Sequence, residues 1–217
     1  MKKANVVCPS GIFLIPTFII FLSFFSFACN KQTAPGFTNI DTTLLFVGNS
    51  LTYTNDLPLL VSAIGKSKGA NIKVEMLALP NYALMDHLTD GNLQKMLATK
   101  KYNIVIVQQG PSSQSEGRTM LLDAATLIKQ FCDDHEAKLA FYMVWPAYAN
   151  YSNFDGVIRN YSEAATITNS ILCPVGKVWK EYIDRSNDLS YYGPDLFHPS
   201  SKGSQVAAEV IYTTLFK

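Results

Sequence analysis

The chain has 217 residues, of which 48% are hydrophobic and 16% are charged, and its formal net charge is +1. This composition is typical of one globular domain that is long enough to form its own core without disulfide or metal staples. The near-neutral charge, with no basic stripe along the sequence, excludes nucleic acid as the expected partner.

The first 29 residues are expected to be a targeting segment and not part of the fold. Lys2 and Lys3 precede an almost entirely apolar stretch from Gly11 to Ala28, which is the layout of a secretory signal. The small residues before Cys29 resemble the lipobox of bacterial lipoproteins, in which the cysteine is lipidated and becomes the first residue of the mature chain. Two other interpretations stay open: a plain cleaved signal, and a retained anchor of roughly 17 apolar residues.

Residues 30–41 are expected to form a flexible tether, and residues 42–217 the folded domain. We therefore expect an exported, membrane-anchored lipoprotein on the periplasmic or outer-membrane face of the cell envelope, or otherwise a secreted protein. A disulfide between Cys132 and Cys173 is permitted in an exported protein, but their apolar neighbourhoods favour two buried free thiols. No CxxC or His-rich spacing indicates a metal or another cofactor.

Strand and helix patterns alternate from residue 44 to the end of the chain. Short apolar runs, typical of strands covered on both faces, predict strands over 44–48, 72–79, 102–107, 138–145 and 171–175. Amphipathic patterns predict helices over 55–68, 84–99, 120–135, 157–170, 177–183 and 201–216. Short loops between these units predict a three-layer α/β/α domain with a five-stranded, mostly parallel sheet of the flavodoxin-like class.

A serine follows the first predicted strand directly. The stretch TTLLFVGNSLTYTNDLP, residues 42–58, changes from an apolar run to polar residues at Gly48-Asn49-Ser50. In parallel sheets, functional residues usually lie at the carboxyl ends of the strands. Gln108 and Gln109 follow the third strand and are expected at the same edge as Ser50. Ser50 is therefore either part of an ordinary strand-to-helix turn or a nucleophile.

A loop near the C-terminus supplies side chains that would activate such a nucleophile. Asp195 and His198 are three residues apart and lead into the last predicted helix. At this spacing the carboxylate can accept a hydrogen bond from imidazole Nδ1–H, which leaves Nε2 free to take a proton from a serine hydroxyl. A capping or turn role would explain each residue singly. Surface or packing roles are expected for the other two histidines, His87 and His135.

The segments FVGNSLT and DLFHPSSKG together resemble the SGNH/GDSL hydrolase superfamily. Its members pair a Gly-Asp-Ser or Gly-Asn-Ser turn after the first strand with a late Asp-x-x-His-Pro. The resemblance spans the domain, and YNIVIVQQGPSS, FYMVWP and CPVGKVW are similar to its bacterial lipoprotein branch. It implies a serine esterase with Ser50 as nucleophile and oxyanion-hole donor, His198 as general base and Asp195 as the residue that orients the base.

The resemblance also implies two further oxyanion-hole donors, at places where this sequence departs from the family pattern. Asn81 stands where the family has a glycine, and asparagine tolerates a left-handed backbone, so its N–H can still donate. The usual asparagine after the third strand is absent, and sialate-O-acetylesterase-like relatives use a Gln-Gly pair there. Gln109 is therefore the first candidate for the third donor and Gln108 the second. Loss of one such donor typically costs about 10²–10³ in rate.

The substrate that the resemblance implies is a small-molecule or glycan ester, with O-acetyl groups on carbohydrate as the first expectation. Tyr82, Trp145 and Tyr148 follow strand ends and are candidates for a sugar-binding cleft, and packing at the rim of the core would explain them equally. A lipase or thioesterase would keep the same triad. A non-catalytic, glycan-binding surface lipoprotein would keep the fold. The sequence leaves the oligomeric state open.

Overall fold

The structure, a computed structural model, describes residues 41–217. The expected targeting segment, its candidate lipidation site Cys29 and most of the tether lie outside these residues. A five-stranded, all-parallel sheet has the order β2-β1-β3-β4-β5. Its strands are β1 (Asp41–Gly48), β2 (Asn71–Ala78), β3 (Ile104–Val107), β4 (Lys138–Tyr142) and β5 (Ile171–Cys173).

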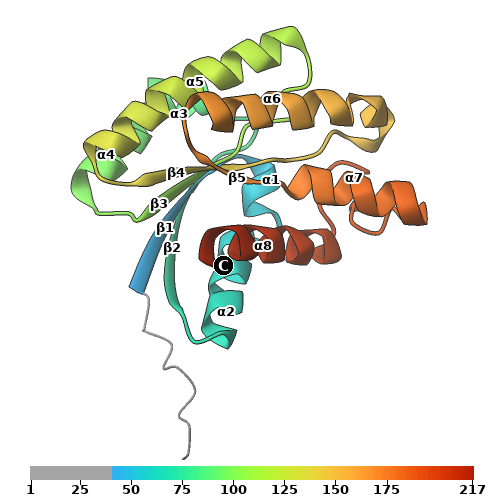
Figure 1. The fold of residues 1–217 in the computed structure, drawn as a ribbon, viewed down its shortest axis with the longest axis horizontal. Helices are drawn as coiled ribbons and strands as arrows, with labels where there is room; N and C mark the ends of the chain where they lie inside the picture. The colour runs from blue at the N-terminus through green and yellow to red at the C-terminus, as the bar shows by residue number, and fades with distance from the viewer. Residues whose placement is uncertain (1–40) are drawn as a thin grey trace, which may run out of the picture. The chain divides into compact units, whose positions relative to one another are not determined.

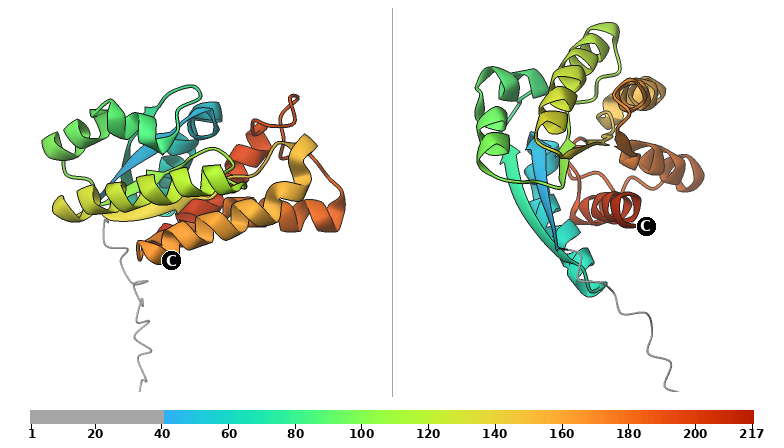
Figure 2. Two further views of the ribbon diagram at one scale, coloured as in Figure 1. Left: turned by 90° about the horizontal axis from the view of Figure 1, so that it is seen from above. Right: turned by 60° about the vertical axis from the view of Figure 1, so that its left-hand side comes forward.

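Helices cover both faces of the sheet, which confirms the predicted three-layer architecture (Figure 1). On one face α2 (Leu57–Ser67) packs against α8 (Ser201–Phe216), and the right-hand view of Figure 2 shows α8 in red across β1 and β2 from the green helices. The opposite face carries α3 (Leu84–Thr89), α4 (Asn92–Thr99), α5 (Ser115–Asp134) and α6 (Phe154–Ile167). The remaining long helix, α7 (Val175–Ser186), packs against both α6 and α8.

The core lies around the central strands β1 and β3. Residues 44–47 and 104–107 are all buried, because helices remove both faces of these strands from solvent. Full burial of one large apolar side chain stabilises a fold by roughly 1.5–3 kcal/mol. These strands therefore hold their carboxyl ends, and the loops that follow them, in fixed positions.

Two predicted helices are interrupted where the backbone takes a left-handed conformation. The helix expected over 55–68 begins only at Leu57, because Asn55 and Asp56 have φ angles of 57° and 53°. The chain before it forms a short helix, α1 (Ser50–Tyr53), and a 3-10 turn, η1 (Thr54–Asp56). The helix expected over 84–99 is divided into α3 and α4, because Gly91 has a φ of 69°.

The two cysteines of the domain, Cys132 and Cys173, are both buried and free, which confirms the predicted state of these thiols. Burial raises the pKa of each thiol to about 12, so both are uncharged at neutral pH. No helix within residues 41–217 has the length and apolar character needed to cross a membrane.

Candidate active site

Ser50 is the first residue of α1 and follows Asn49, which caps that helix. Gly48 ends β1 where the surroundings leave no room for a side chain. A Cβ at this position would collide with Oγ1 of Thr52 and would lie 2.5 Å from Oε1 of Gln108. The tight approach of these groups requires a glycine, and the turn leaves Ser50 half-buried at the carboxyl end of the sheet.

Ser50, His198 and Asp195 form one connected row of hydrogen bonds. His198 Nε2 lies 2.9 Å from Ser50 Oγ, and His198 Nδ1 lies 2.5 Å from Asp195 Oδ2. This contact with the imidazole is the main cause that lowers the pKa of Asp195 to about 2, so the carboxylate is charged at neutral pH. A carboxylate only accepts hydrogen bonds, so Nδ1 carries the proton and Nε2 faces the serine hydroxyl as an acceptor.

The loop that carries Asp195 and His198 is held by its own backbone. Asp195 Oδ1 accepts from the N–H groups of Phe197 at 3.0 Å and His198 at 2.9 Å. The carbonyl of His198 accepts from the N–H of Gly193 at 2.7 Å. Leu196 has a φ of 55°, a conformation that only a few per cent of non-glycine residues adopt. This tight turn directs the second carboxylate oxygen toward the imidazole.

Trp145 supports the same loop from inside the domain. Its side chain is fully buried, and its Nε1–H donates to the carbonyl of Phe197 at 3.0 Å. Its ring stacks on Trp179 with the centroids 3.4 Å apart. Trp145 therefore packs inside the domain and has no exposed surface at a cleft, which agrees with the packing alternative for this residue.

Asn49 joins the turn Gly48–Ser50, called the serine turn below, to the loop that follows β2. Its Oδ1 accepts from the N–H of Leu51 at 3.2 Å, and its Nδ2 donates to the carbonyl of Tyr82 at 3.0 Å. The carbonyl of Gly48 accepts from the N–H of Leu79 at 3.2 Å. Sequence reasoning missed this role of Asn49, although a polar residue directly before a helix is the signal of a cap.

Two backbone N–H groups near the serine have no partner. Asn81 has the left-handed backbone expected for it, with a φ of 62°, and belongs to the loop that Asn49 holds. Among residues 41–217, no acceptor takes the N–H of Ser50 or the N–H of Asn81. Both groups therefore remain available to an anion or a carbonyl oxygen.

The two glutamines after β3 lie in different surroundings. Gln108 Oε1 accepts from the N–H of Asn49 at 3.0 Å and from Oγ1 of Thr52 at 2.8 Å. Its Nε2 is buried and has no partner in the part of the chain that the structure describes. Gln109 Nε2 instead donates to Oγ of Ser112 at 2.8 Å and to a carbonyl near the start of α5. The geometry thus favours Gln108, the second candidate, over Gln109, the first.

The other two aromatic candidates belong to different loops, one after β2 and one after β4. Tyr82 is half-buried, and its hydroxyl donates to Oδ2 of Asp90 at 2.9 Å. Tyr148 is 40% exposed, and its N–H donates to the carbonyl of Leu196 at 2.9 Å. Tyr82 is therefore next to Asn81, and Tyr148 is next to the loop that carries Asp195 and His198.

Asn55 is a second residue that sequence reasoning missed, because it lay within a predicted helix. Its Nδ2 donates to the carbonyl of Pro199 at 3.1 Å and to Oγ of Ser204 at 2.9 Å. This side chain ties the end of the serine-bearing segment to the residue after His198. The signal was its type, since asparagine is enriched among residues with a positive φ.

His87 and His135 lie away from the serine hydroxyl. His87 is 1% exposed, and its Nε2–H donates to the carbonyl of Gly48 at 2.8 Å, so the expected packing role is confirmed. Burial is the main cause that lowers the pKa of His87. His135 Nδ1–H donates to the carbonyl of Phe131 at 2.8 Å. Residues 41–217 contain no group of three or more His, Cys, Asp or Glu side chains that could hold a metal ion.

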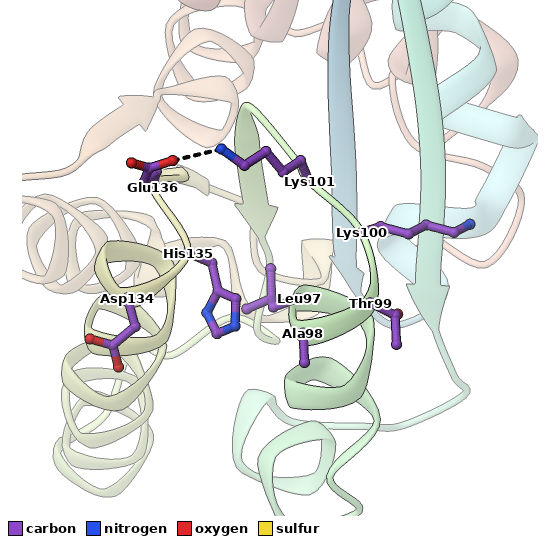
Figure 3. Close-up of a pocket in the computed structure, with 8 residues that line it drawn as sticks. All are labelled: Leu97, Ala98, Thr99, Lys100, Lys101, Asp134, His135 and Glu136. Atoms are coloured by element: carbon purple, nitrogen blue, oxygen red, sulfur yellow. Dashed lines mark hydrogen bonds and ion pairs between the residues drawn. The ribbon is translucent and has the colours of Figure 1, made fainter.

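A separate hollow of about 420 Å³ lies at the opposite end of the sheet, before the first residues of β3 and β4 (Figure 3). Both of its lysines are already paired: Lys101 contacts Glu136 at 2.7 Å, and Lys100 contacts Glu75 at 2.8 Å. Figure 3 shows the two lysines extending in different directions. The hollow therefore presents no converging set of free polar groups.

No protein-family model matches the sequence, and no curated protein matches it either. Solved structures do match. A protein from Slackia heliotrinireducens assigned as an SGNH hydrolase has a TM-score of 0.69 and 22% identity, over 81% of this chain and 99% of its own. A lipase/acylhydrolase from Enterococcus faecalis has a TM-score of 0.65 and 14% identity, over 79% of this chain and 94% of its own.

A third match is a catalytic histidine-to-alanine mutant of an acetylxylan esterase from Geobacillus stearothermophilus. It has a TM-score of 0.64 and 15% identity, over 83% of this chain and 97% of its own. Together with the all-parallel sheet, these similarities show that the chain has the three-layer fold of the SGNH hydrolases.

Proposed function

We propose that this chain, which has the SGNH hydrolase fold, is an exported serine esterase that hydrolyses acyl esters, with O-acetyl groups on carbohydrate as its substrate class. The observation that carries the proposal is the connected row from Ser50 Oγ through His198 to Asp195, at 2.9 and 2.5 Å. Capping or turn roles would explain these residues singly, but they give no reason for a serine 148 positions away to meet the imidazole.

In the first half of the reaction, His198 Nε2 takes the proton of Ser50 as Oγ attacks the ester carbonyl carbon. Asp195 keeps Nδ1 protonated and stabilises the imidazolium that forms. The tetrahedral intermediate then collapses, the bond to the alcohol oxygen breaks, and His198 gives its proton to the leaving alcohol. The product of this half is an acyl group bound to Ser50 Oγ.

The negative charge that develops on the carbonyl oxygen needs fixed donors. The free N–H groups of Ser50 and Asn81 supply two, and we assign the third to Nε2 of Gln108, which is buried beside the serine turn. Donors that are already oriented stabilise the transition state without reorganising, and each is worth about 10²–10³ in rate.

The second half repeats the same steps with water. His198 removes a proton from a water molecule, the hydroxide attacks the acyl carbon, and the bond to Ser50 Oγ breaks. His198 returns the proton to the serine, and the carboxylic acid leaves.

The choice of an acetyl group on carbohydrate is supported by the similarity to acetylxylan esterases. The matching lipase/acylhydrolase is as similar in fold, so a longer acyl chain is the competing substrate. A non-catalytic glycan-binding protein is disfavoured by the intact hydrogen bonds of Ser50, His198 and Asp195, which such a protein would not need.

Hydrolysis of p-nitrophenyl acetate and p-nitrophenyl butyrate by the parent protein and by Ser50→Ala tests the proposal. We expect turnover that depends on Ser50 and a higher kcat/KM for acetate. A higher kcat/KM for butyrate would favour the longer-chain acyl hydrolase. Equal rates for the folded parent and the folded variant would contradict the esterase.

We also propose that the protein is anchored in the cell envelope through a lipid on Cys29. The support is the order of a basic start, an apolar stretch and small residues before the cysteine. Cells that express the parent should incorporate labelled palmitate into the protein, and cells that express Cys29→Ser should not. Labelling of both proteins, or of neither, would contradict lipidation at this residue.

A further inference from the structure

A hollow of about 430 Å³ lies beside the loop that carries His198, and we propose that it binds the sugar on the alcohol side of the ester. Its lining residues are Tyr148, Tyr151, Ile183, Asp184 and Asn187. This inference rests on the proposed esterase function and assigns the part of the molecule that recognises the leaving alcohol.

The proposed reaction determines where the alcohol part of the ester must bind. His198 must protonate the leaving oxygen, so the alcohol part of the ester lies on the histidine side of the scissile bond. The oxyanion donors Ser50 and Asn81 belong instead to the turn and the loop that Asn49 joins. A site for the alcohol therefore belongs next to the loop of His198.

Tyr148 places the hollow at that loop. Its N–H donates to the carbonyl of Leu196 at 2.9 Å, and Leu196 is two residues before His198, which is about 7 Å of extended chain at most. Tyr148 and Leu196 are 40% and 41% exposed. Few large apolar side chains within residues 41–217 are as exposed as these two. Both residues therefore place exposed apolar surface at the loop that carries the histidine.

Aromatic rings in the hollow are fixed by their neighbours. Tyr148 and Tyr151 meet edge to face with their centroids 6.0 Å apart, and Tyr148 meets Tyr192 in the same way at 6.2 Å. The hydroxyl of Tyr151 donates to Oδ1 of Asp184 at 2.6 Å. Rings that are already held in place lose little conformational freedom when a sugar packs its C–H face on them.

The polar groups of the hollow suit hydroxyl groups. Asp184 is held by Tyr151 and by Nζ of Lys180 at 2.8 Å, and its carboxylate oxygens keep further lone pairs for donors. The side-chain amide of Asn187 has no partner in the described residues and offers both a donor and an acceptor. Asn187 has a φ of 53°, which ends α7 and turns the chain at the rim.

This mixture favours a sugar over an acyl chain. A cavity of this size holds a small ligand, and an aromatic floor with a few polar groups at its rim fixes the orientation of a polyhydroxylated ring. An acyl chain would offer no hydrogen bonds to Asp184 or Asn187, whereas the hydroxyl groups of a sugar can bond to both. The hollow at the other end of the sheet has neither an aromatic floor nor a connection to the histidine loop.

A binding experiment tests the inference without depending on catalysis. Titration of xylo-, cello- and N-acetylglucosamine oligosaccharides into Ser50→Ala should show binding of at least one of them. Adding Tyr148→Ala or Asn187→Ala should weaken that binding about tenfold, whereas Leu127→Ala, a residue on α5 that is 43% exposed, should change it less than twofold. Tyr148→Ala keeps the backbone bond to Leu196, so the loop is preserved. Binding to none of the three sugars, or an equal loss in the Leu127 control, would overturn the inference.

Kinetics of Tyr148→Ala in the otherwise unchanged protein give the second test. The ratio of kcat/KM for the acetylated form of the bound oligosaccharide to kcat/KM for p-nitrophenyl acetate should fall about tenfold, through a higher KM for the saccharide. An unchanged ratio would overturn the sugar site. Hydrolysis of the aryl ester by the parent shows that the esterase exists whatever the ratio does, so the two proposals fail separately.

Discussion

The two ends of the sheet each have a histidine close to carboxylates, but they differ in how these groups are connected. At the carboxyl end, His198 contacts Asp195 through one ring nitrogen and Ser50 through the other. At the amino end, His135 donates to a backbone carbonyl of its own helix, while Glu136 pairs with Lys101. Similar residue types thus occur at both ends, but within residues 41–217 an acid, a base and a nucleophile are linked only at the carboxyl end.

The two ends differ because tight turns at the carboxyl end bring the catalytic side chains close together. Gly48 and Asn49 bring the serine turn against the neighbouring loops, and the Asp195 turn directs its carboxylate at the imidazole. At the amino end, Lys100 and Lys101 pair with Glu75 and Glu136, and the two lysines extend in different directions (Figure 3). A hollow with titratable groups is therefore a weaker sign of function than a connected set of hydrogen bonds.

The largest expected effect is at Asp195. Asp195→Asn should lower kcat for p-nitrophenyl acetate by on the order of 10³–10⁴, because the amide no longer holds His198 in the tautomer that accepts the serine proton. The matched change at the amino end, Asp134→Asn, should leave kcat within twofold. Similar rates for the two variants would remove the distinction between the two ends.

The next effect separates the two glutamines. Gln108→Ala should lower kcat about 10²-fold, because it removes a donor beside the serine turn. Gln109→Ala should lower kcat less and mainly destabilise the fold, by about 1–3 kcal/mol, because the hydroxyl of Ser112 and a carbonyl lose their partner. Kinetics together with chemical denaturation of both variants measure the split, and the reverse pattern would restore Gln109 as the donor.

A smaller effect concerns the buried side of the serine turn. The pKa of His87 is lowered by burial, so below about pH 6.5 the unfolded chain binds a proton at this residue more readily than the folded one. The free energy of unfolding should therefore fall as pH falls from 7 to 5, although the hydrogen bond to the carbonyl of Gly48, and then the charges of Asp86 and Asp90, oppose part of this effect. His87→Gln, which does not titrate, should make that fall shallower. An unchanged pH dependence would show that His87 does not contribute to it.

The smallest effect is expected at the amino end itself. His135→Ala should leave kcat and KM for p-nitrophenyl acetate within twofold, since the hydrogen bond of its ring among residues 41–217 goes to the carbonyl of Phe131 at 2.8 Å. A loss of more than tenfold in the correctly folded variant would mean that this end contributes to the reaction after all.

Most of the fold could be predicted because its signals are local. The apolar runs of β1 and β3 are continuous since both faces are buried, and the last helix was predicted with the bounds that the structure has, Ser201–Phe216. The errors are of two kinds. Some bounds are shifted, since β4 ends at Tyr142 instead of Trp145 and α5 begins at Ser115 instead of Met120. At Asn55 and Gly91, a left-handed backbone delays the start of one helix and divides another, and hydrophobic periodicity does not contain such angles.

The candidate site was only partly predictable, because side-chain direction depends on long-range contacts. The spacing of Asp195 and His198 indicated their contact, and the motif indicated Ser50. Neighbouring residues of an extended chain point to opposite sides, so the sequence alone could not tell which glutamine after β3 faces the serine turn. The burial of Trp145 depends on its stacking with Trp179, which comes from α7.

Labelling with a fluorophosphonate probe, followed by mass spectrometry of the modified peptide, tests the central claim most directly. The probe reacts with a serine only where a base removes the hydroxyl proton and an oxyanion hole receives the phosphoryl oxygen. The account predicts one adduct, on Ser50, that is absent from Ser50→Ala and formed much more slowly in His198→Ala. No adduct on the folded parent, or adducts that persist unchanged in Ser50→Ala, would contradict it.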